Sequence, residues 1–244
     1  MATAPAVVVL DEVTKHFRLR HSRSLKENLV WKVQGRALHE EFTALGGVNV
    51  TITQGETVAL LGRNGSGKST LLKLVAGVMA QDAGRVLVRG RVAGLLEVGA
   101  GLHPDLTGSE NIFLNASILG MAQAEIEERF DDIVAFADIG RFLDLQVRFY
   151  SSGMFLRLAF AVAVHTEPDV FLVDEILAVG DEPFRRKCLA RIEALREQGR
   201  TLVIVSHDLG MVERLCDRGV VLAGGRVVQD GPVAQAGAAM SALE

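Results

Sequence analysis

The sequence predicts an α/β fold organised around a parallel sheet. Short, largely apolar runs stand at 57–61, 170–173 and 201–205, and longer segments with helical spacing separate them. Runs of this length are typical of strands that are buried on both faces of a sheet. The first run leads directly into a glycine-rich loop and then a helical segment. Because strands alternate with helices in this way, we expect a parallel sheet with helices on its faces.

Further strands are predicted on both sides of these runs. Residues 7–10 begin a strand, and apolar residues at alternate positions continue it toward Leu19. Residues 48–52 show the same strand-like alternation. Two hairpins are expected, at 86–96 about Gly90 and at 219–228 about the Gly224-Gly225 pair.

The middle of the chain carries helix signals and no strand signal. Residues 107–110 match a capping box, so a helix should begin there and continue to about Gly120. We therefore expect a helical lobe at about 102–165, inserted between strands. The other helices are expected at 122–138, 153–164, 184–198 and 232–244.

Residues 62–70, GRNGSGKST, fit the phosphate-loop pattern G-x-x-x-x-G-K-[ST]. Glycines allow backbone N–H groups to turn toward a phosphate chain, and the next helix directs its positive end at the same phosphates. Lys68 is expected to reach the β- and γ-phosphates, while the Ser69 hydroxyl ligates Mg²⁺. The loop residues predicted to bind ATP are Gly62, Arg63, Asn64, Gly65, Ser66, Gly67, Lys68, Ser69 and Thr70.

The run at 170–173 ends in Asp174 and Glu175. Phosphate-loop ATPases place a carboxylate beside Mg²⁺ at the end of such a strand, so Asp174 is predicted to be a metal ligand. Glu175 is predicted to orient or deprotonate the attacking water. Strands often end in acidic residues, and the pattern gains its meaning from the phosphate loop.

Two other sites leave alternatives open when they are considered alone. His207 follows the run at 201–205, where it could contact a γ-phosphate at the ligand-binding edge of the sheet or serve only as a structural histidine. Ser151 or Ser152, in the sequence YSSGM, could cap the following helix. The same hydroxyls, together with the free N–H groups of a helix start, could also bind an anion.

The motifs together resemble those of the nucleotide-binding subunits of ABC transporters, over about 8–229. GRNGSGKST is similar to their Walker A motif, VFLVDE to their Walker B motif and VSHD to the segment with their switch histidine. The resemblance implies one nucleotide-binding domain, 1–244, with a phosphate-loop core, a mostly parallel sheet, an antiparallel β subdomain and the inserted helical lobe. It implies Mg²⁺-dependent ATP hydrolysis, with Lys68, Glu175 and His207 as catalytic residues.

YSSGM is similar to the family's signature motif, usually LSGGQ. Ser151 and Gly153 are kept, whereas Ser152 and Met154 are changed. The resemblance implies a head-to-tail homodimer in which these residues contact the γ-phosphate that the other copy holds. It also assigns Asp181 to the segment that the family calls the D-loop.

Two positions depart from the family pattern. A glutamine usually stands in the loop that joins the two lobes, where it touches Mg²⁺ and the membrane partner, and here that loop offers Glu97. A carboxylate keeps an oxygen ligand but adds charge, so Glu97 is a candidate metal ligand with an altered role. The aromatic residue that stacks on adenine, commonly tyrosine, is Phe17, which can stack but has no hydroxyl.

The segments LLEVGAGLHPDLTGSENI, YSSGMFLRLAFA and DEILAVGD resemble one branch, the exporters of polyprenyl-linked polysaccharides such as O-antigen, teichoic acid, capsule and cell-wall galactan. That branch carries an additional helix, which here corresponds to 22–33. Leu25, Leu29 and Val33 share one face of this segment, with basic residues and Trp31 beside them. The segment is either a surface connector or, as the branch suggests, a helix that meets an anionic headgroup at the mouth of the transport path.

Composition limits the partners and the location. The net charge of −4 and the pI of 5.9 argue against a general nucleic-acid binder. We see no leader sequence, and the longest apolar stretch, 155–164, is too short to span a bilayer. The chain by itself is therefore expected to be cytosolic. The resemblance to the polysaccharide exporters implies that it works at the cytoplasmic face of the membrane, held by an integral membrane subunit that carries a lipid-linked glycan. A soluble ABC-type ATPase without a transport role is the alternative.

Overall fold

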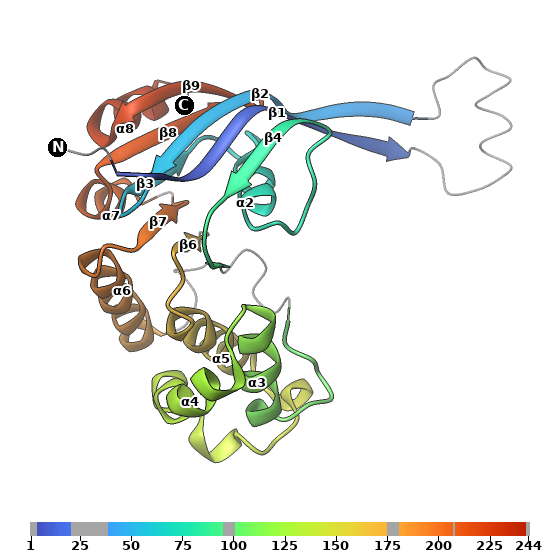
Figure 1. The fold of residues 1–244 in the computed structure, drawn as a ribbon, viewed down its shortest axis with the longest axis vertical. Coiled ribbons are helices and arrows are strands. Elements are labelled where there is room, and N and C mark those ends of the chain that lie inside the picture. Colours follow the sequence, from blue (N-terminus) through green and yellow to red (C-terminus); the bar gives the residue numbers. More distant parts are fainter. Residues whose placement is uncertain (1–3, 21–38, 95–100, 175–180, 207, 243–244) are drawn as a thin grey trace, which may run out of the picture.

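The computed structural model describes residues 4–20, 39–94, 101–174, 181–206 and 208–242. Within these ranges the strands form two sheets (Figure 1). The larger sheet has the order β5-β6-β7-β3-β8-β9, in which every neighbouring pair is parallel except β8 and β9. Its strands are β3 (Thr57–Leu61), β5 (Val92–Gly94), β6 (Val170–Val173), β7 (Thr201–Ile204), β8 (Arg218–Ala223) and β9 (Arg226–Pro232). The predicted α/β class and the mostly parallel sheet are confirmed.

The smaller sheet is antiparallel, with the order β2-β1-β4. It consists of β1 (Ala6–Arg20), β2 (His39–Thr53) and β4 (Ala83–Val88). The strand signals at 7–10 and at the alternating positions that follow belong to one long strand, β1, whose pairing with β2 is interrupted by register shifts. This sheet is the expected antiparallel β subdomain.

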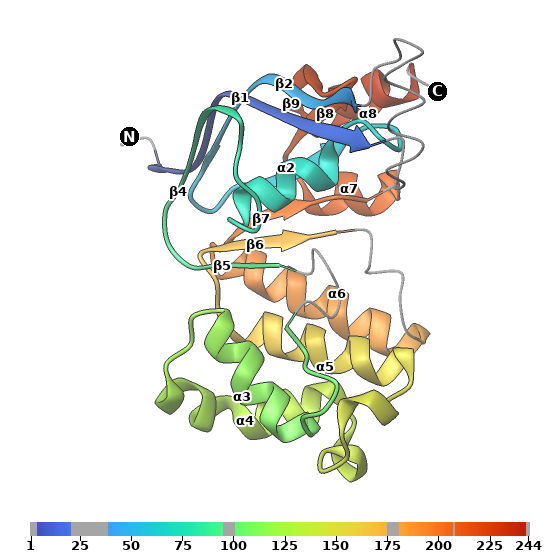
Figure 2. The same ribbon diagram turned by 90° about the vertical axis from the view of Figure 1, so that its right-hand side faces the viewer.

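Helix α2 (Lys68–Val75) lies between the two sheets (Figure 2). Strand β3 of the larger sheet can pack against α2 on one face only, because successive side chains of a strand point to opposite faces. Val58 and Leu60 pack with α2 and the smaller sheet in one core, and Ala59 and Leu61 pack with the remaining helices in the other. Burial on both faces explains why this strand is almost entirely apolar.

The second core joins the larger sheet to the helices on its other face. It continues into a helical lobe made by α3, α4 and α5, which forms the lower part of Figure 1. The helices are α3 (Gly108–Ile118), α4 (Gln123–Ala137), α5 (Ser152–His165), α6 (Glu182–Glu197), α7 (Leu209–Leu215) and α8 (Val233–Ser241). The predicted capping box at Thr107 and Glu110 is formed, with Thr107 accepting a hydrogen bond from the Glu110 N–H.

The hairpin predicted at 86–96 is wrong. β4 pairs with β1 in the smaller sheet, whereas β5 pairs with β6 in the larger one. Between them, the Arg91 N–H donates to Asp169 at 2.8 Å, and Gly90 adopts φ 90° against the same side chain. Two apolar runs around a glycine give the same local pattern whether they pair with each other or enter different sheets. Contacts with residues far along the chain decide the pairing here. The hairpin predicted about Gly224 and Gly225 is formed by β8 and β9.

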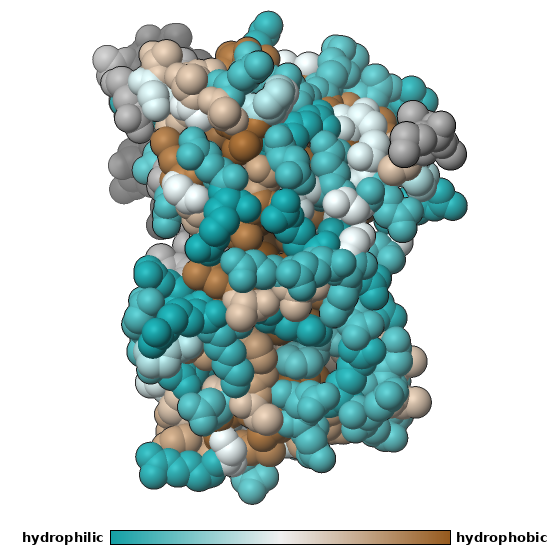
Figure 3. All heavy atoms as spheres, turned by 90° about the vertical axis from the view of Figure 1, so that its left-hand side faces the viewer, coloured by the Kyte–Doolittle hydropathy of each residue, from teal (hydrophilic) through white to brown (hydrophobic). Residues whose placement is uncertain are grey.

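Hydrophilic side chains cover most of the face shown in Figure 3, with apolar patches between them. No helix in the described part of the chain is both long and apolar enough to cross a bilayer.

Candidate nucleotide-binding site

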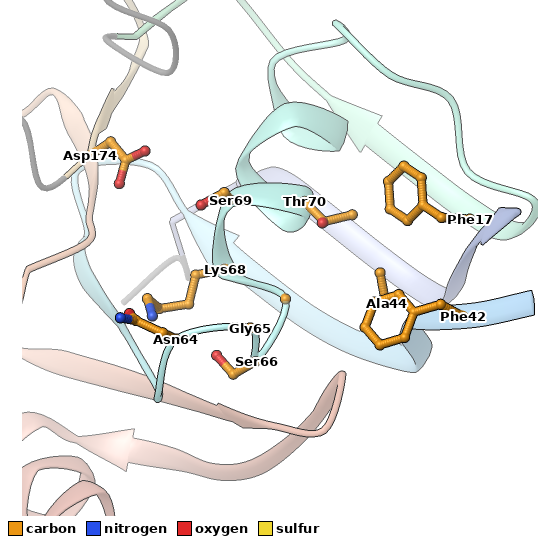
Figure 4. Close-up of a pocket in the computed structure, with 11 residues that line it drawn as sticks. Phe17, Phe42, Ala44, Asn64, Gly65, Ser66, Lys68, Ser69, Thr70 and Asp174 are labelled. Atoms are coloured by element: carbon orange, nitrogen blue, oxygen red, sulfur yellow. The ribbon is translucent and has the colours of Figure 1, made fainter. Parts of the chain in front are cut away.

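A cavity of about 420 Å³ lies beside the phosphate loop. Figure 4 shows Asp174 at one side of the loop and two phenylalanine rings at the other. Elements from three parts of the chain line it: the β1–β2 pair, the loop with the start of α2, and the end of β6. The lining residues are Phe17, Phe42, Ala44, Asn64, Gly65, Ser66, Gly67, Lys68, Ser69, Thr70 and Asp174.

Close neighbours leave no room for a Cβ at two glycines of the loop. Gly67, the N-cap of α2, has φ 109°, and a Cβ there would lie 2.7 Å from Leu45 Cδ2 and 2.8 Å from the Ala44 carbonyl oxygen. Gly62 has φ 148°, and a Cβ there would meet the Leu222 carbonyl oxygen. L-residues rarely adopt these conformations, so the cradle depends on glycine. No side chain caps the N–H groups at the start of α2.

Lys68 is buried, with 7% of its surface exposed, and lines the cavity. Its ammonium donates to the carbonyl oxygens of Gly62 at 2.6 Å and Arg63 at 3.2 Å. The Ser66 hydroxyl, also buried, makes no hydrogen bond within the described residues. A buried cation, an unsatisfied hydroxyl and uncapped N–H groups on one wall fit an anionic ligand such as a phosphate chain.

Ser69 and Asp174 come from different elements and line the same cavity (Figure 4). Asp174 directly follows β6, and strand order places β7 between β6 and β3, the strand that leads into the loop. Parallel strands end at one edge of the sheet, so the loop and the carboxylate converge there. Hydroxyl and carboxylate oxygens are ligands that suit Mg²⁺. Of the predicted metal ligands, Ser69 and Asp174 are therefore brought together, and Glu97 lies outside the described residues.

Phe17 lines the far end of the cavity, as predicted for a residue that stacks on the base. Phe42 lines it as well, which the sequence reasoning missed. The two residues are directly opposite each other in the β1–β2 register. The sequence predicts a strand only at 48–52, whereas β2 begins at His39, so the pairing of Phe42 with Phe17 does not follow from the sequence pattern.

Ser151 is the N-cap of α5, and its hydroxyl accepts a hydrogen bond from the Met154 N–H at 3.2 Å. The capping alternative is thus confirmed for Ser151. Ser152 and Gly153 form the first turn of the helix. Ser151 and Ser152 are exposed on the helical lobe, and the signature residues do not line the cavity within one chain.

Asp181 is the N-cap of α6, where it accepts from the Phe184 N–H at 3.2 Å. Arg157 of α5 donates to both of its carboxylate oxygens, at 2.9 and 3.0 Å. The same guanidinium donates to Asp138 at 3.1 Å, and it stacks over the Phe184 ring with its carbon 5.0 Å from the centroid. Arg157 therefore fastens the helix that carries the signature residues to the start of α6.

Glu175, His207 and the segment 22–33 lie outside the described residues, so their predicted roles remain predictions.

A parallel sheet with a phosphate loop after one strand and a carboxylate after another defines a phosphate-loop nucleotide-binding protein. A family model described as ABC transporter matches residues 45–178, more than half of the 244 residues. The chain belongs to the ABC transporter family.

Two relatives are similar over most of this chain. The O-antigen export system ATP-binding protein RfbB of Myxococcus xanthus is 48% identical over 227 residues, which cover 90% of this chain and 52% of the relative. The protein of the same name from Klebsiella pneumoniae is 44% identical over 217 residues, which cover 87% and 88%. The chain thus spans about half the length of the Myxococcus protein and most of the Klebsiella protein.

Among solved structures, a dimeric ATP-binding cassette in a post-hydrolysis state bound to ADP and Pi superposes with a TM-score of 0.72. It is 25% identical in sequence, and the match covers 93% of this chain and 98% of that one.

Proposed function

We propose that this chain is the ATPase subunit of an exporter that moves a polyprenyl-diphosphate-linked polysaccharide across the cytoplasmic membrane through a separate transmembrane subunit. The cavity that joins the phosphate loop, Asp174 and the aromatic end supports nucleotide binding. Identities of 48% and 44% to proteins named for O-antigen export support the transport role. In this proposal residues 1–244 form one nucleotide-binding domain at the cytoplasmic face, and nucleic acid is not a partner.

The residues of the cavity have distinct roles in the proposed hydrolysis. Lys68 and the N–H groups of the loop hold the β- and γ-phosphates of ATP. Ser69 and Asp174 would hold Mg²⁺, which neutralises phosphate charge when it is bound. Glu175 positions the water, and His207 contacts the γ-phosphate. The water oxygen bonds to the γ-phosphorus while Glu175 accepts a proton from the water, the bond from that phosphorus to the β–γ bridging oxygen breaks, and ADP and phosphate leave.

The complete site requires two copies in this proposal. Ser151, Ser152, Gly153 and Met154 of one copy contact the γ-phosphate that the other copy holds. Two observations support this arrangement: the signature residues lie apart from the cavity of their own chain, and the solved relative is a dimeric cassette. Because the contact needs the γ-phosphate, hydrolysis removes it and the dimer can switch between two states.

The membrane partner is tested by affinity purification of this chain from native membranes. We expect an integral membrane protein to co-purify, together with a lipid-linked glycan. Recovery of the chain without an integral partner would contradict the transport role.

The catalytic assignment is tested separately by Glu175→Gln in the purified complex, which should retain ATP binding and lose most turnover because the amide has the same shape but is not a base. Hydrolysis at the wild-type rate would remove Glu175 from its role.

A further inference from the structure

Phe42 is a half-exposed aromatic residue at the rim of the nucleotide cavity. Its side chain is 49% exposed, whereas Phe136, Phe160, Phe171 and Phe184 are all buried in the core at 9% or less. Leaving a ring in water forgoes about 1.5–3 kcal/mol of burial, so an exposed phenylalanine beside a cavity is informative. Phe42 differs from the exposed Phe149 of the helical lobe because it lines the nucleotide cavity, where a bound ligand would cover its ring.

The β1–β2 register places Phe42 beside the residue expected to stack on the base. Phe17 and Phe42 are direct partners in the antiparallel pair, so their side chains project from the same face with Cβ atoms about 5 Å apart. Ala44, two residues on and on the same face, also lines the cavity. In Figure 4 both rings lie on the side of the loop opposite Asp174. The Lys15 ammonium lies 5.8 Å from the centroid of the Phe17 ring and 3.1 Å from Asp82.

Strand β2 is fixed relative to the phosphate loop. Gly67 approaches Ala44 and Leu45 so closely that a Cβ would collide with both. The Gly46 N–H donates to the Gly225 carbonyl oxygen at 2.9 Å, and the Gly225 N–H donates to that of Ser66 at 3.1 Å. These contacts connect β2, the β8–β9 turn and the loop. The backbone of β2 next to Phe42 therefore has a fixed position relative to the phosphate loop.

We propose that Phe42 and Phe17 together form a two-ring platform that stacks on the nucleotide base, with Phe42 a binding residue in its own right. This inference rests on the proposed nucleotide-binding function. Stacking responds to the area of the base and not to the hydrogen-bonding groups at its edge. The platform consequently favours purines over pyrimidines, and Phe42 contributes similarly to adenine and guanine.

The test uses equilibrium binding of ADP, GDP, CDP and pyrophosphate, with Mg²⁺, to the full chain. For Phe42→Ala we expect the Kd of ADP and of GDP to rise about fivefold to tenfold, the lower part of the range for a lost base–aromatic stack. The Kd of CDP should rise less, about twofold to threefold, because a pyrimidine covers less of the platform. Pyrophosphate, which has no base, should bind as it does to the wild type.

The matched control is Phe149→Ala, which removes a ring that is 69% exposed on the helical lobe. It should leave all four affinities unchanged. Phe42→Trp keeps an aromatic surface and should bind ADP at least as tightly as the wild type. The inference is overturned if Phe42→Ala binds ADP like the Phe149→Ala control, or if pyrophosphate and ADP lose affinity equally. If the wild type binds neither ADP nor pyrophosphate, the proposed function itself is wrong.

Discussion

Two helix N-termini of this chain are proposed to bind nucleotide, one in its own cavity and one in the cavity of a second copy, and they are built differently. Helix α2 begins at Gly67, in a left-handed conformation, with no side chain capping its N–H groups. Helix α5 begins at Ser151, in an extended conformation, and its hydroxyl caps the Met154 N–H. The first lies between two sheets beside a cavity, whereas the second is exposed on the helical lobe.

The difference shows what each end requires from its surroundings. At the start of α2 no side-chain cap is formed within the described residues, and the loop is held in shape by β2 and β8. Around α5 one donor is already satisfied, so this end is stable without a ligand. The α2 end lies beside a cavity of its own chain, while the α5 end does not, in agreement with the proposal that it completes a site on another copy.

The largest effect should follow from adding one methyl group at the α2 end. Gly67→Ala must adopt φ near 109° and place its Cβ against Ala44 and Leu45. We expect a loss of about 2–4 kcal/mol in the free energy of unfolding, from strain and overcrowding together, measured by denaturant titration. Gly65→Ala is the control, since Gly65 has φ 79° but no neighbour within 4 Å of a Cβ. An equal loss in both variants would show that close packing of β2 does not shape the loop.

At the α5 end, Ser151→Ala should cost about 1 kcal/mol of stability through the lost cap. ADP affinity of the single chain should not change, because Ser151 does not line its own cavity. ATP turnover should fall about tenfold or more, as for loss of a donor to the transferred phosphate. Thr107→Ala removes a comparable cap from α3 in the same lobe and should lose stability without losing turnover. Equal turnover in the Ser151→Ala and Thr107→Ala variants would show that Ser151 acts only as a helix cap.

A smaller effect is expected at the link between α5 and α6. In Arg157 the Nη2 group donates to Asp181 and the Nη1 group donates to Asp138. Arg157→Lys has a single ammonium in place of this fork, so turnover should fall severalfold with ADP affinity unchanged. The stability change should be below about 1 kcal/mol, since both carboxylates are more than half exposed. Arg148→Lys alters an exposed pair with Asp105 on the same lobe and is the control. A turnover loss shared by both variants would argue against a specific link.

The last effect concerns pH and changes the free energy of unfolding without a predicted change in turnover. Burial lowers the pKa of His165 at the end of α5, against the opposing hydrogen bond to the Ala161 carbonyl oxygen. The unfolded chain therefore takes up this proton first, and stability should fall as pH drops below about 6.5, by at most about 1.4 kcal/mol per pH unit. His165→Gln does not titrate and should lose less between pH 7.5 and 5.5. Identical pH slopes in urea unfolding would contradict the assignment.

Local sequence patterns predict the phosphate loop at the start of α2, but they do not predict contacts between distant parts of the chain. The phosphate loop, Asp174 and the buried strands could be predicted because their sequence signals lie within a few residues. The pairing of β4 and β5 could not, since each strand takes a partner from far along the chain. Phe42 could not be predicted as a cavity residue for the same reason. Its position depends on the pairing with Phe17, which is 25 residues earlier in the chain. The double contact of Arg157 with Asp181 likewise depends on how two helices pack.

The composite site is tested most directly by sedimentation of the Glu175→Gln chain with and without Mg-ATP. This variant should bind ATP without hydrolysing it. We expect a monomer without nucleotide and a dimer with ATP, and the same chain with the additional Ser151→Ala change should remain largely monomeric. A monomer under all conditions, including in the presence of the membrane partner, would contradict the head-to-tail arrangement of the two helix ends.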